Sequence, residues 1–219
     1  MKKRHDSLLH GVCVANSEAK SRRLLAGFVV LLITAIFTVA GCDNGGGSDD
    51  PELAEWNGTW NSYYDYFDEP ELVAILEDQY DASDAYKTMF ATFDPFLAFV
   101  KNLALTDFDS FVVQGDTITF YKRMKTIDTV TYTYKGVRQV VWGQETADFY
   151  AFEGDKAGDH KYLIFEEADR DTADGPLHFH MRYGSESIDS LVSGAGMWAP
   201  TIVSYDTTIA ELKVFMSGD

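Results

Sequence analysis

Hydrophobic and polar positions change their period along this chain near residue 107. Before that point, two stretches place apolar residues at helical spacing. The first, EPELVAILEDQYDA, begins with acidic residues, which are favourable at a helix N-terminus. The second, SDAYKTMFATFDPFLAFVKNLAL, starts at Ser83 as a helix cap, and Pro95 is expected to bend or divide it. The pattern therefore predicts two helical segments ahead of a different kind of structure.

From Asp107 onward, short runs alternate apolar and polar residues, as β-strands do. FDSFVVQGDTITFYKRM predicts a hairpin that turns at Gln114-Gly115-Asp116. DTVTYTYKG is expected to end at Gly136, and the pattern continues in RQVVWG, ADFYAFEG, HKYLIFE and LHFHMRY, the last clear strand. Two short helices are expected in ESIDSLVSG and DTTIAELKVFM. Six or seven antiparallel strands at a spacing of about 8 to 12 residues fit a closed or nearly closed barrel, so the predicted fold is mainly β with added helices.

A basic and then apolar segment precedes the folded region. Six Lys and Arg residues come before the run LLAGFVVLLITAIFTVA (24–40), which at about 17 residues is slightly short for a helix that spans a bilayer. The run ends in VAGC, which resembles the lipobox of bacterial lipoprotein signal peptides, where small residues precede an acylated cysteine. We therefore predict a signal peptide over residues 1–41 and lipidation of Cys42, the alternative being an uncleaved membrane anchor.

The segment that follows Cys42 has too little apolar surface to fold. DNGGGSDDPE is rich in Gly and Asp and predicts a flexible acidic tether over residues 42–52, ahead of one compact domain over residues 53–219. Removal of residues 1–41 leaves 12 basic and 33 acidic residues, which changes the formal charge from −17 to −21. Such a polyanion attracts cations and is repelled by nucleic acid, which we exclude as a partner. Cys42 is then the single cysteine, so neither a disulfide nor a thiolate metal site is expected.

LHFHMRY places two histidines, His178 and His180, at alternate positions of a predicted strand. Alternate side chains share one face of a strand, about 6.5 to 7 Å apart along it, whereas Phe179 and Met181 take the opposite, apolar face. Neutral imidazole nitrogens bind borderline-soft divalent ions such as zinc, but a usable site needs a third protein donor. On its own, the pair fits half of a zinc site or two ordinary surface or barrel-lining histidines.

Several stretches, in the right order, resemble the ZinT (YodA-like) family of metal-binding domains. LAEWNGTWNSYYDYF resembles the opening of that family, in which a Leu and a Trp precede Gly-x-Trp and an aromatic residue. HKYLIFEEADRDTADGPLHFHMRYGSESIDSLVSGAGMWAP resembles the later core, with its Lys-Tyr strand, acidic turn, His-Phe-His and a Trp ahead of a Pro. The resemblance extends over residues 53–216. It implies a calycin-like (lipocalin-like) antiparallel β-barrel with added helices, in which Trp60 packs across the closed end.

The same resemblance implies a function. The family binds zinc, or a similar divalent ion such as cadmium, outside the cytoplasm and usually supports zinc uptake; in Gram-positive relatives the domain is fused to a zinc-uptake solute-binding protein. His178 and His180 match the His-Phe-His ligand pair of the family. For this chain, the resemblance implies a metal-binding protein held at a bacterial membrane by the lipid on Cys42, with a zinc-uptake transporter component as partner.

The third ligand of the family is where this chain differs. In the family, a histidine closes a Phe-Ser-Asp-His segment after the preceding strand, and a gapless match puts Ala168 at that position. Carboxylate oxygens also bind zinc, so Glu166, Glu167 and Asp169 are the candidate replacements. The loop that follows is one residue longer here, and the match can therefore shift onto any of the three.

Other interpretations remain open from the residues alone. His160, beside Asp159, is expected to be a solvated turn histidine and not a ligand. A calycin-type carrier of a small apolar ligand, with a degenerate metal site, would suit the aromatic content of 14%, although aromatic residues also fill barrel cores. Metal-assisted hydrolysis would need a general base that nothing in the sequence identifies, so we predict that the protein is not an enzyme.

Overall fold

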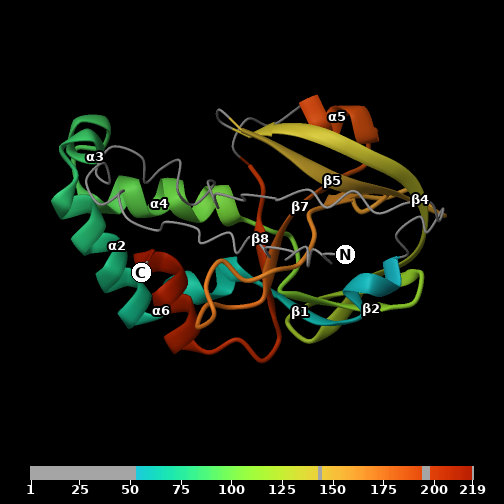
Figure 1. Cartoon of the computed structure of the whole chain (residues 1–219), viewed down its shortest axis with the longest axis horizontal. Helices are drawn as coiled ribbons and strands as arrows, with labels where there is room; N and C mark the ends of the chain where they lie inside the picture. Colours follow the sequence, from blue (N-terminus) through green and yellow to red (C-terminus); the bar gives the residue numbers. More distant parts are fainter. Residues whose placement is uncertain (1–52, 143–144, 194–197, 219) are drawn as a thin grey trace, which may run out of the picture.

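The computed structural model describes residues 53–142, 145–193 and 198–218 (Figure 1). The predicted signal peptide, the tether and the lipidation site at Cys42 lie outside these residues and stay predictions. Within the described residues, strands form a closed antiparallel barrel in which each strand pairs with the next one along the chain and β1 pairs with β8. The predicted calycin-like barrel is therefore confirmed. Among the helices of this part of the chain, none combines the length and the apolar character that a membrane span needs.

The barrel strands are β1 (Gly58–Ser62), β2 (Ser110–Gln114), β3 (Thr117–Lys122), β4 (Lys125–Trp142), β5 (Glu145–Gly154), β6 (Tyr162–Phe165), β7 (His178–Gly184) and β8 (Thr201–Ser204). The α-helices are α2 (Pro70–Ala82), α3 (Asp84–Met89), α4 (Phe93–Ala104), α5 (Ile188–Ser193) and α6 (Ile209–Ser217). Two 3₁₀ helices, η1 (Leu53–Trp56) and η2 (Tyr63–Asp68), flank β1. The predicted helices and hairpins occur in the predicted order, but the barrel has eight strands among the described residues and not six or seven, and β8 lies between the two C-terminal helices.

The sequence predictions for two glycines in the strand region, Gly115 and Gly136, have different outcomes. Gly115 turns the predicted β2–β3 hairpin and has a φ of 63°, a left-handed conformation that glycine adopts without steric cost. The expectation that a strand ends at Gly136 is wrong, because β4 runs through this residue. Gly136 has a φ of 91° and lies where the register between β4 and β5 shifts, between Tyr134 and Val137. Here the glycine therefore forms a bulge inside a long strand instead of ending it.

The second predicted helical segment is divided, but ahead of Pro95. Its cap is confirmed, because the side chain of Ser83 accepts a hydrogen bond from the backbone N–H of Tyr86 at 3.3 Å. The division falls at residues 90–92, where the backbone is extended at Phe90 and again at Thr92. Pro95 lies in the first turn of α4, where its missing N–H costs no helical hydrogen bond.

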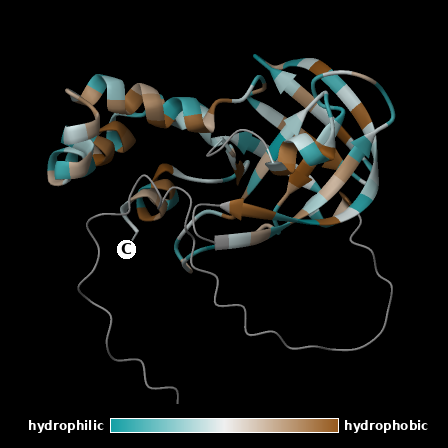
Figure 2. Ribbon diagram, turned by 90° about the horizontal axis from the view of Figure 1, so that it is seen from above, coloured by the Kyte–Doolittle hydropathy of each residue, from teal (hydrophilic) through white to brown (hydrophobic). Residues whose placement is uncertain are grey.

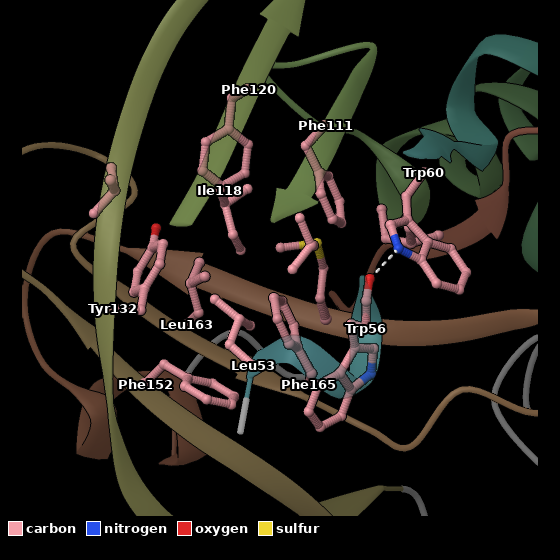
Figure 3. Packing of buried hydrophobic residues seen from close by; sticks show 14 of the residues in the cluster. Leu53, Trp56, Trp60, Phe111, Ile118, Phe120, Tyr132, Phe152, Leu163 and Phe165 are labelled. Atoms are coloured by element: carbon pink, nitrogen blue, oxygen red, sulfur yellow. Dashed lines mark hydrogen bonds between the residues drawn. The ribbon is translucent and has the colours of Figure 1, made fainter. Parts of the chain in front are cut away.

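Aromatic side chains fill the inside of the barrel (Figure 3). Trp60 is buried, as the sequence predicts, and its Nε1 donates a hydrogen bond to the carbonyl oxygen of Trp56 at 2.8 Å. Its ring also packs edge-on against Phe179, with 4.8 Å between the centroids. The residues buried around them include Phe108, Phe111, Phe120, Phe152 and Phe165. The aromatic content that a ligand carrier would use to line a cavity thus serves the core.

A second apolar layer lies outside the barrel wall. Along β8, Ile202 belongs to the barrel core, whereas its neighbour Val203 packs against the helices. Figures 1 and 2 show α2, α3, α4 and α6 gathered on this side of the barrel, while α5 lies over β4, β5 and β6. Residues of η2, α2, α4 and α6 form this layer with Val203. The outer face of β7 and β8 is therefore covered by helices, and side chains that point outward there are buried.

Candidate metal centre

His178 and His180 lie on this covered outer face of β7. Phe179 and Met181 belong to the barrel core, so the alternation predicted from the sequence places the two histidines outside the wall. Both are buried all the same, with exposed fractions of 2% and 8%. Their ring centroids are 5.8 Å apart with the planes at 88°, and the ring of Phe215 from α6 lies 4.7 Å from that of His178. The two imidazoles are thus brought together in a water-poor space between barrel and helix.

One nitrogen of each imidazole contacts a neighbouring oxygen. Nδ1 of His178 lies 3.3 Å from the carbonyl oxygen of Pro176, and since a carbonyl can only accept, this nitrogen carries the proton. Nδ1 of His180 lies 3.2 Å from the hydroxyl oxygen of Thr201. Nε2 of His178 is 3.9 Å from Oδ2 of Asp171. This orientation is the one that metal-binding histidines adopt when a second hydrogen bond fixes their tautomer.

The segment between β6 and β7 decides which residue stands beside each histidine. The backbone N–H of Glu166 donates to the carbonyl of His180 at 3.0 Å. Asp169 and His178 exchange both backbone hydrogen bonds, at 3.0 and 2.9 Å, and form an antiparallel bridge. Residues opposite each other in such a bridge project their side chains to the same face. Asp169 is therefore the cross-strand neighbour of His178.

Two residues of this segment, Glu167 and Ala168, lie opposite a single residue of β7, Phe179. A two-to-one pairing is a β-bulge, which accommodates one extra residue in one strand. Ala168 packs against the barrel core, whereas Glu167 is exposed. Asp169, and not Ala168, therefore stands beside His178 on the outer face of β7.

A carboxylate that the sequence reasoning does not single out joins this group. Asp169, Asp171 and His178 each offer one ligand atom, and the three atoms lie within 4.8 Å of one another. Zinc bonds of about 2.0 to 2.2 Å separate neighbouring ligand atoms by roughly 3.5 Å, so a small movement of the exposed Asp171 would complete the cluster. The signal available in the sequence is the spacing of Asp171 two residues after Asp169.

Burial gives the ionisable groups of this face unusual proton affinities. It raises the pKa of Glu166 to about 8, and the negative charges of Asp169 and Asp171 add to this effect. Burial likewise raises the pKa of Asp169. It lowers the pKa of His180 to about 3, assisted by the charge of His178, so His180 is neutral at ordinary pH, as a metal ligand must be. Crowded carboxylates beside the neutral imidazole of His180 form a surrounding that a cation stabilises.

His160 is not the solvated turn histidine that the sequence predicts. It is 3% exposed, its Nδ1 lies 3.2 Å from Asp128 Oδ2, and its Nε2 lies 3.1 Å from Asp107 Oδ1. Its ring stacks on Phe120 with 4.0 Å between the centroids. Burial alone would lower the pKa of His160, but the hydrogen bonds and charges of the two aspartates raise it. Both nitrogens face carboxylates, so His160 is a structural clamp between β4, which carries Asp128, and the segment before β2, which carries Asp107, and it is not a member of the metal centre.

Comparisons with known proteins find one matching family model and similar solved structures. A family model described as "ZinT (YodA) periplasmic lipocalin-like zinc-recruitment" matches residues 43–217. A comparison with curated proteins finds no match. The chain is similar to the Zn(II)-bound ZinT-like domain of Streptococcus pneumoniae AdcA, with a TM-score of 0.60 and 20% identity over 85% of this chain and 97% of that domain. Zn(II)-bound AdcA from the same organism gives a TM-score of 0.59 and 18% identity over 95% of this chain and 41% of that one, so this chain corresponds to less than half of AdcA.

Proposed function

Because the chain belongs to the ZinT family of periplasmic lipocalin-like zinc-recruitment proteins, we propose that it captures zinc at the outer face of β7. The proposed ligands are His178 and His180 from β7, with Asp169 and Asp171 from the segment before it. The observation that carries the proposal is the antiparallel bridge that sets Asp169 beside His178, with a carboxylate oxygen of Asp171 within 4.8 Å of both.

The donor set suits zinc in number and kind. Two imidazole nitrogens and two carboxylate oxygens can complete the tetrahedral coordination that zinc adopts in proteins. The same combination is less suited to cuprous ions, which favour thiolate and thioether ligands. A cation beside the partly buried Asp169 also offsets the cost of holding its charge away from water. The clustering of Asp169, Asp171 and His178 supports this proposal, to which His180 adds a fourth donor.

The remaining carboxylates have smaller roles in this proposal. Glu166 borders His180 through the backbone pairing of β6 and β7 and is a reserve donor on the same face. Glu167 is exposed to solvent, and we assign it only a contribution to the negative field.

We further propose where the captured ion goes. A lipid on Cys42 would hold the domain at a bacterial membrane, and the ion would be transferred to a component of a zinc-uptake transporter. The support for this partner is that a ZinT-like domain is a part of AdcA in Streptococcus pneumoniae. Cadmium, which resembles zinc in charge and ligand preference, is proposed as a second ion that the site accepts.

Isothermal titration of the metal-free protein with zinc tests the ligand set. The wild type should bind about one zinc ion, as expected for one tetrahedral site. Asp169→Ala should weaken binding, and Glu167→Ala, a matched loss of one carboxylate from the same segment, should leave the affinity within about threefold of wild type, since an exposed charge contributes little. Equal losses in the two variants would reject Asp169 as a ligand and leave only a general effect of negative charge.

A further inference from the structure

Arg170 lies between the two proposed carboxylate ligands, Asp169 and Asp171, and its guanidinium makes two contacts. Nη1 donates a hydrogen bond to the carbonyl oxygen of Gly175. The same nitrogen is 3.3 Å from Oε1 of Glu211 in α6. Figure 1 shows the loop that carries Arg170 (orange) beside α6 (red). The side chain of Arg170 therefore connects the two ends of the acidic loop, residues 169–175, with each other and with α6.

The contact with Gly175 closes the loop that holds Asp171. The loop turns at its far end, where the backbone N–H of Gly175 donates to the carbonyl of Thr172 at 3.1 Å. The next residue, Pro176, supplies the carbonyl that accepts from Nδ1 of His178. The hydrogen bond from Arg170 thus holds together the two ends of the loop. This loop carries the proposed ligand Asp171 and leads to Pro176, whose carbonyl orients His178.

The contact with Glu211 connects this loop to a firmly held position on α6. Oε2 of Glu211 accepts hydrogen bonds from the backbone nitrogen and the hydroxyl of Thr208, at 2.8 and 2.9 Å, in a capping box. From the same helix, the ring of Phe215 packs against His178. Hence α6 meets the proposed centre at two points, directly at one ligand and through Arg170 at the loop of another.

From these contacts we propose that Arg170 is a positioning residue for zinc capture, which ties the acidic loop to α6 and holds Asp171 toward His178. This role rests on the proposed zinc function and adds to it a residue, Arg170, that orders the exposed ligand Asp171. Asp171 needs such a device, because its side chain is 32% exposed and lies on a loop, whereas the histidines are fixed in β7. Without the bridge, the carboxylate would have to be ordered at the moment of binding.

Whether removal of Arg170 weakens or tightens zinc binding distinguishes a positioning role from a simple effect of its charge. A guanidinium beside the centre repels a divalent cation, so if charge were its main effect, removal of Arg170 would tighten zinc binding. If Arg170 positions Asp171, its removal weakens binding although the site becomes more negative. Loss of an outer partner of a metal ligand typically weakens affinity by about 10- to 100-fold, which exceeds the electrostatic gain at a half-exposed position.

The experiment measures zinc affinity and dissociation for Arg170→Gln, with the wild-type chain and Lys213→Gln in parallel. Lys213 is a matched control: it lies on α6, its Nζ is 2.8 Å from Glu71, and its side chain is 47% exposed against 43% for Arg170. Competition with a chromophoric chelator gives the affinity, and stopped-flow transfer of zinc to that chelator gives the dissociation rate. We expect Arg170→Gln to bind about 10-fold or more weakly, chiefly through faster dissociation, and Lys213→Gln to match wild type within about twofold.

The outcomes distinguish failure of the positioning role of Arg170 from failure of the proposed zinc function. Zinc binding by wild type that Arg170→Gln leaves unchanged or strengthens would overturn the positioning role alone. A wild-type chain that binds no zinc would overturn the proposed function. Thermal unfolding of the metal-free forms checks the fold; should Arg170→Gln be unstable, Arg170→Lys carries the test, because it keeps the charge but cannot bridge both acceptors in the same way. An intermediate dissociation rate for Arg170→Lys supports positioning, and a wild-type rate contradicts it.

Discussion

Histidine substitutions at residues 168 and 169 distinguish the pairing with a bulge, seen in the structure, from the gapless match to the family. The structure sets Asp169 beside His178 and turns Ala168 toward the barrel core. Asp169→His should therefore retain zinc binding through a third imidazole, whereas Ala168→His should not improve it. The gapless match predicts the reverse, since it gives the family histidine the position of Ala168.

The magnitudes follow from where each side chain lies. An imidazole at residue 168 would be forced against the barrel core, and overpacking of this kind costs about 1 to 3 kcal/mol of unfolding free energy. At residue 169, the new ring would replace a partly buried carboxylate on the metal face with a smaller penalty. Removal of the ligand altogether, in Asp169→Ala, should weaken zinc binding by about 100-fold or more, beyond the range for outer-shell partners.

Chelator competition measures zinc affinity, and urea unfolding of the metal-free proteins measures stability. The expected pattern is wild-type-like or tighter binding for Asp169→His, unchanged binding with reduced stability for Ala168→His, and loss of affinity for Asp169→Ala. Tighter binding by Ala168→His together with lost binding by Asp169→His would refute the bulge and the donor assignment that depends on it.

Two further predictions concern the fold that holds the site. His160→Phe keeps the stacking on Phe120 but removes hydrogen bonds to Asp107 and Asp128, and it should lower the unfolding free energy by about 2 to 4 kcal/mol at pH 6. Because the folded pKa of His160 is raised above 6.5, its stabilisation is fully present below pH 6.5 and is lost as the pH rises through the folded pKa; the urea midpoints of variant and wild type should converge over that interval, and a gap that is constant from pH 5.5 to 9 would contradict the clamp. Phe179→Ala, which empties a buried aromatic position of the barrel, should cost about 3 to 5 kcal/mol in urea unfolding, and a cost below about 1 kcal/mol would show that Phe179 does not face the core.

Local patterns in the sequence predict much of this molecule. Alternation alone separates Phe179 and Met181, on an apolar face, from the histidine pair on the opposite face, and the structure shows that the apolar face is the inside of the barrel. The Ser83 cap and the Gly115 turn follow from side-chain and backbone preferences that act within a few residues. In contrast, β8 has only four residues, Thr201–Ser204, which is too short for alternation to be recognised, and its place in the barrel depends on pairing with β1 and β7.

The features that the sequence does not reveal depend on partners far along the chain. His160 is buried because Asp128 and Asp107, which precede it by 32 and 53 residues, surround its ring. Gly136 does not end its strand, because β5 pairs with β4 on both sides of this residue. The choice among the acidic residues after β6 depends on a bulge, and a bulge is defined only once β6 and β7 are paired.

Zinc titration of the metal-free wild-type chain beside His178→Ala/His180→Ala tests the central claim most directly. Calorimetry with thermal unfolding of both proteins gives stoichiometry, affinity and a check on the fold. We expect about one zinc ion per wild-type chain and no binding at this site in the folded double variant, because two of the four donors are removed. Equal zinc uptake by the two folded proteins would contradict the claim that the outer face of β7 is the metal centre.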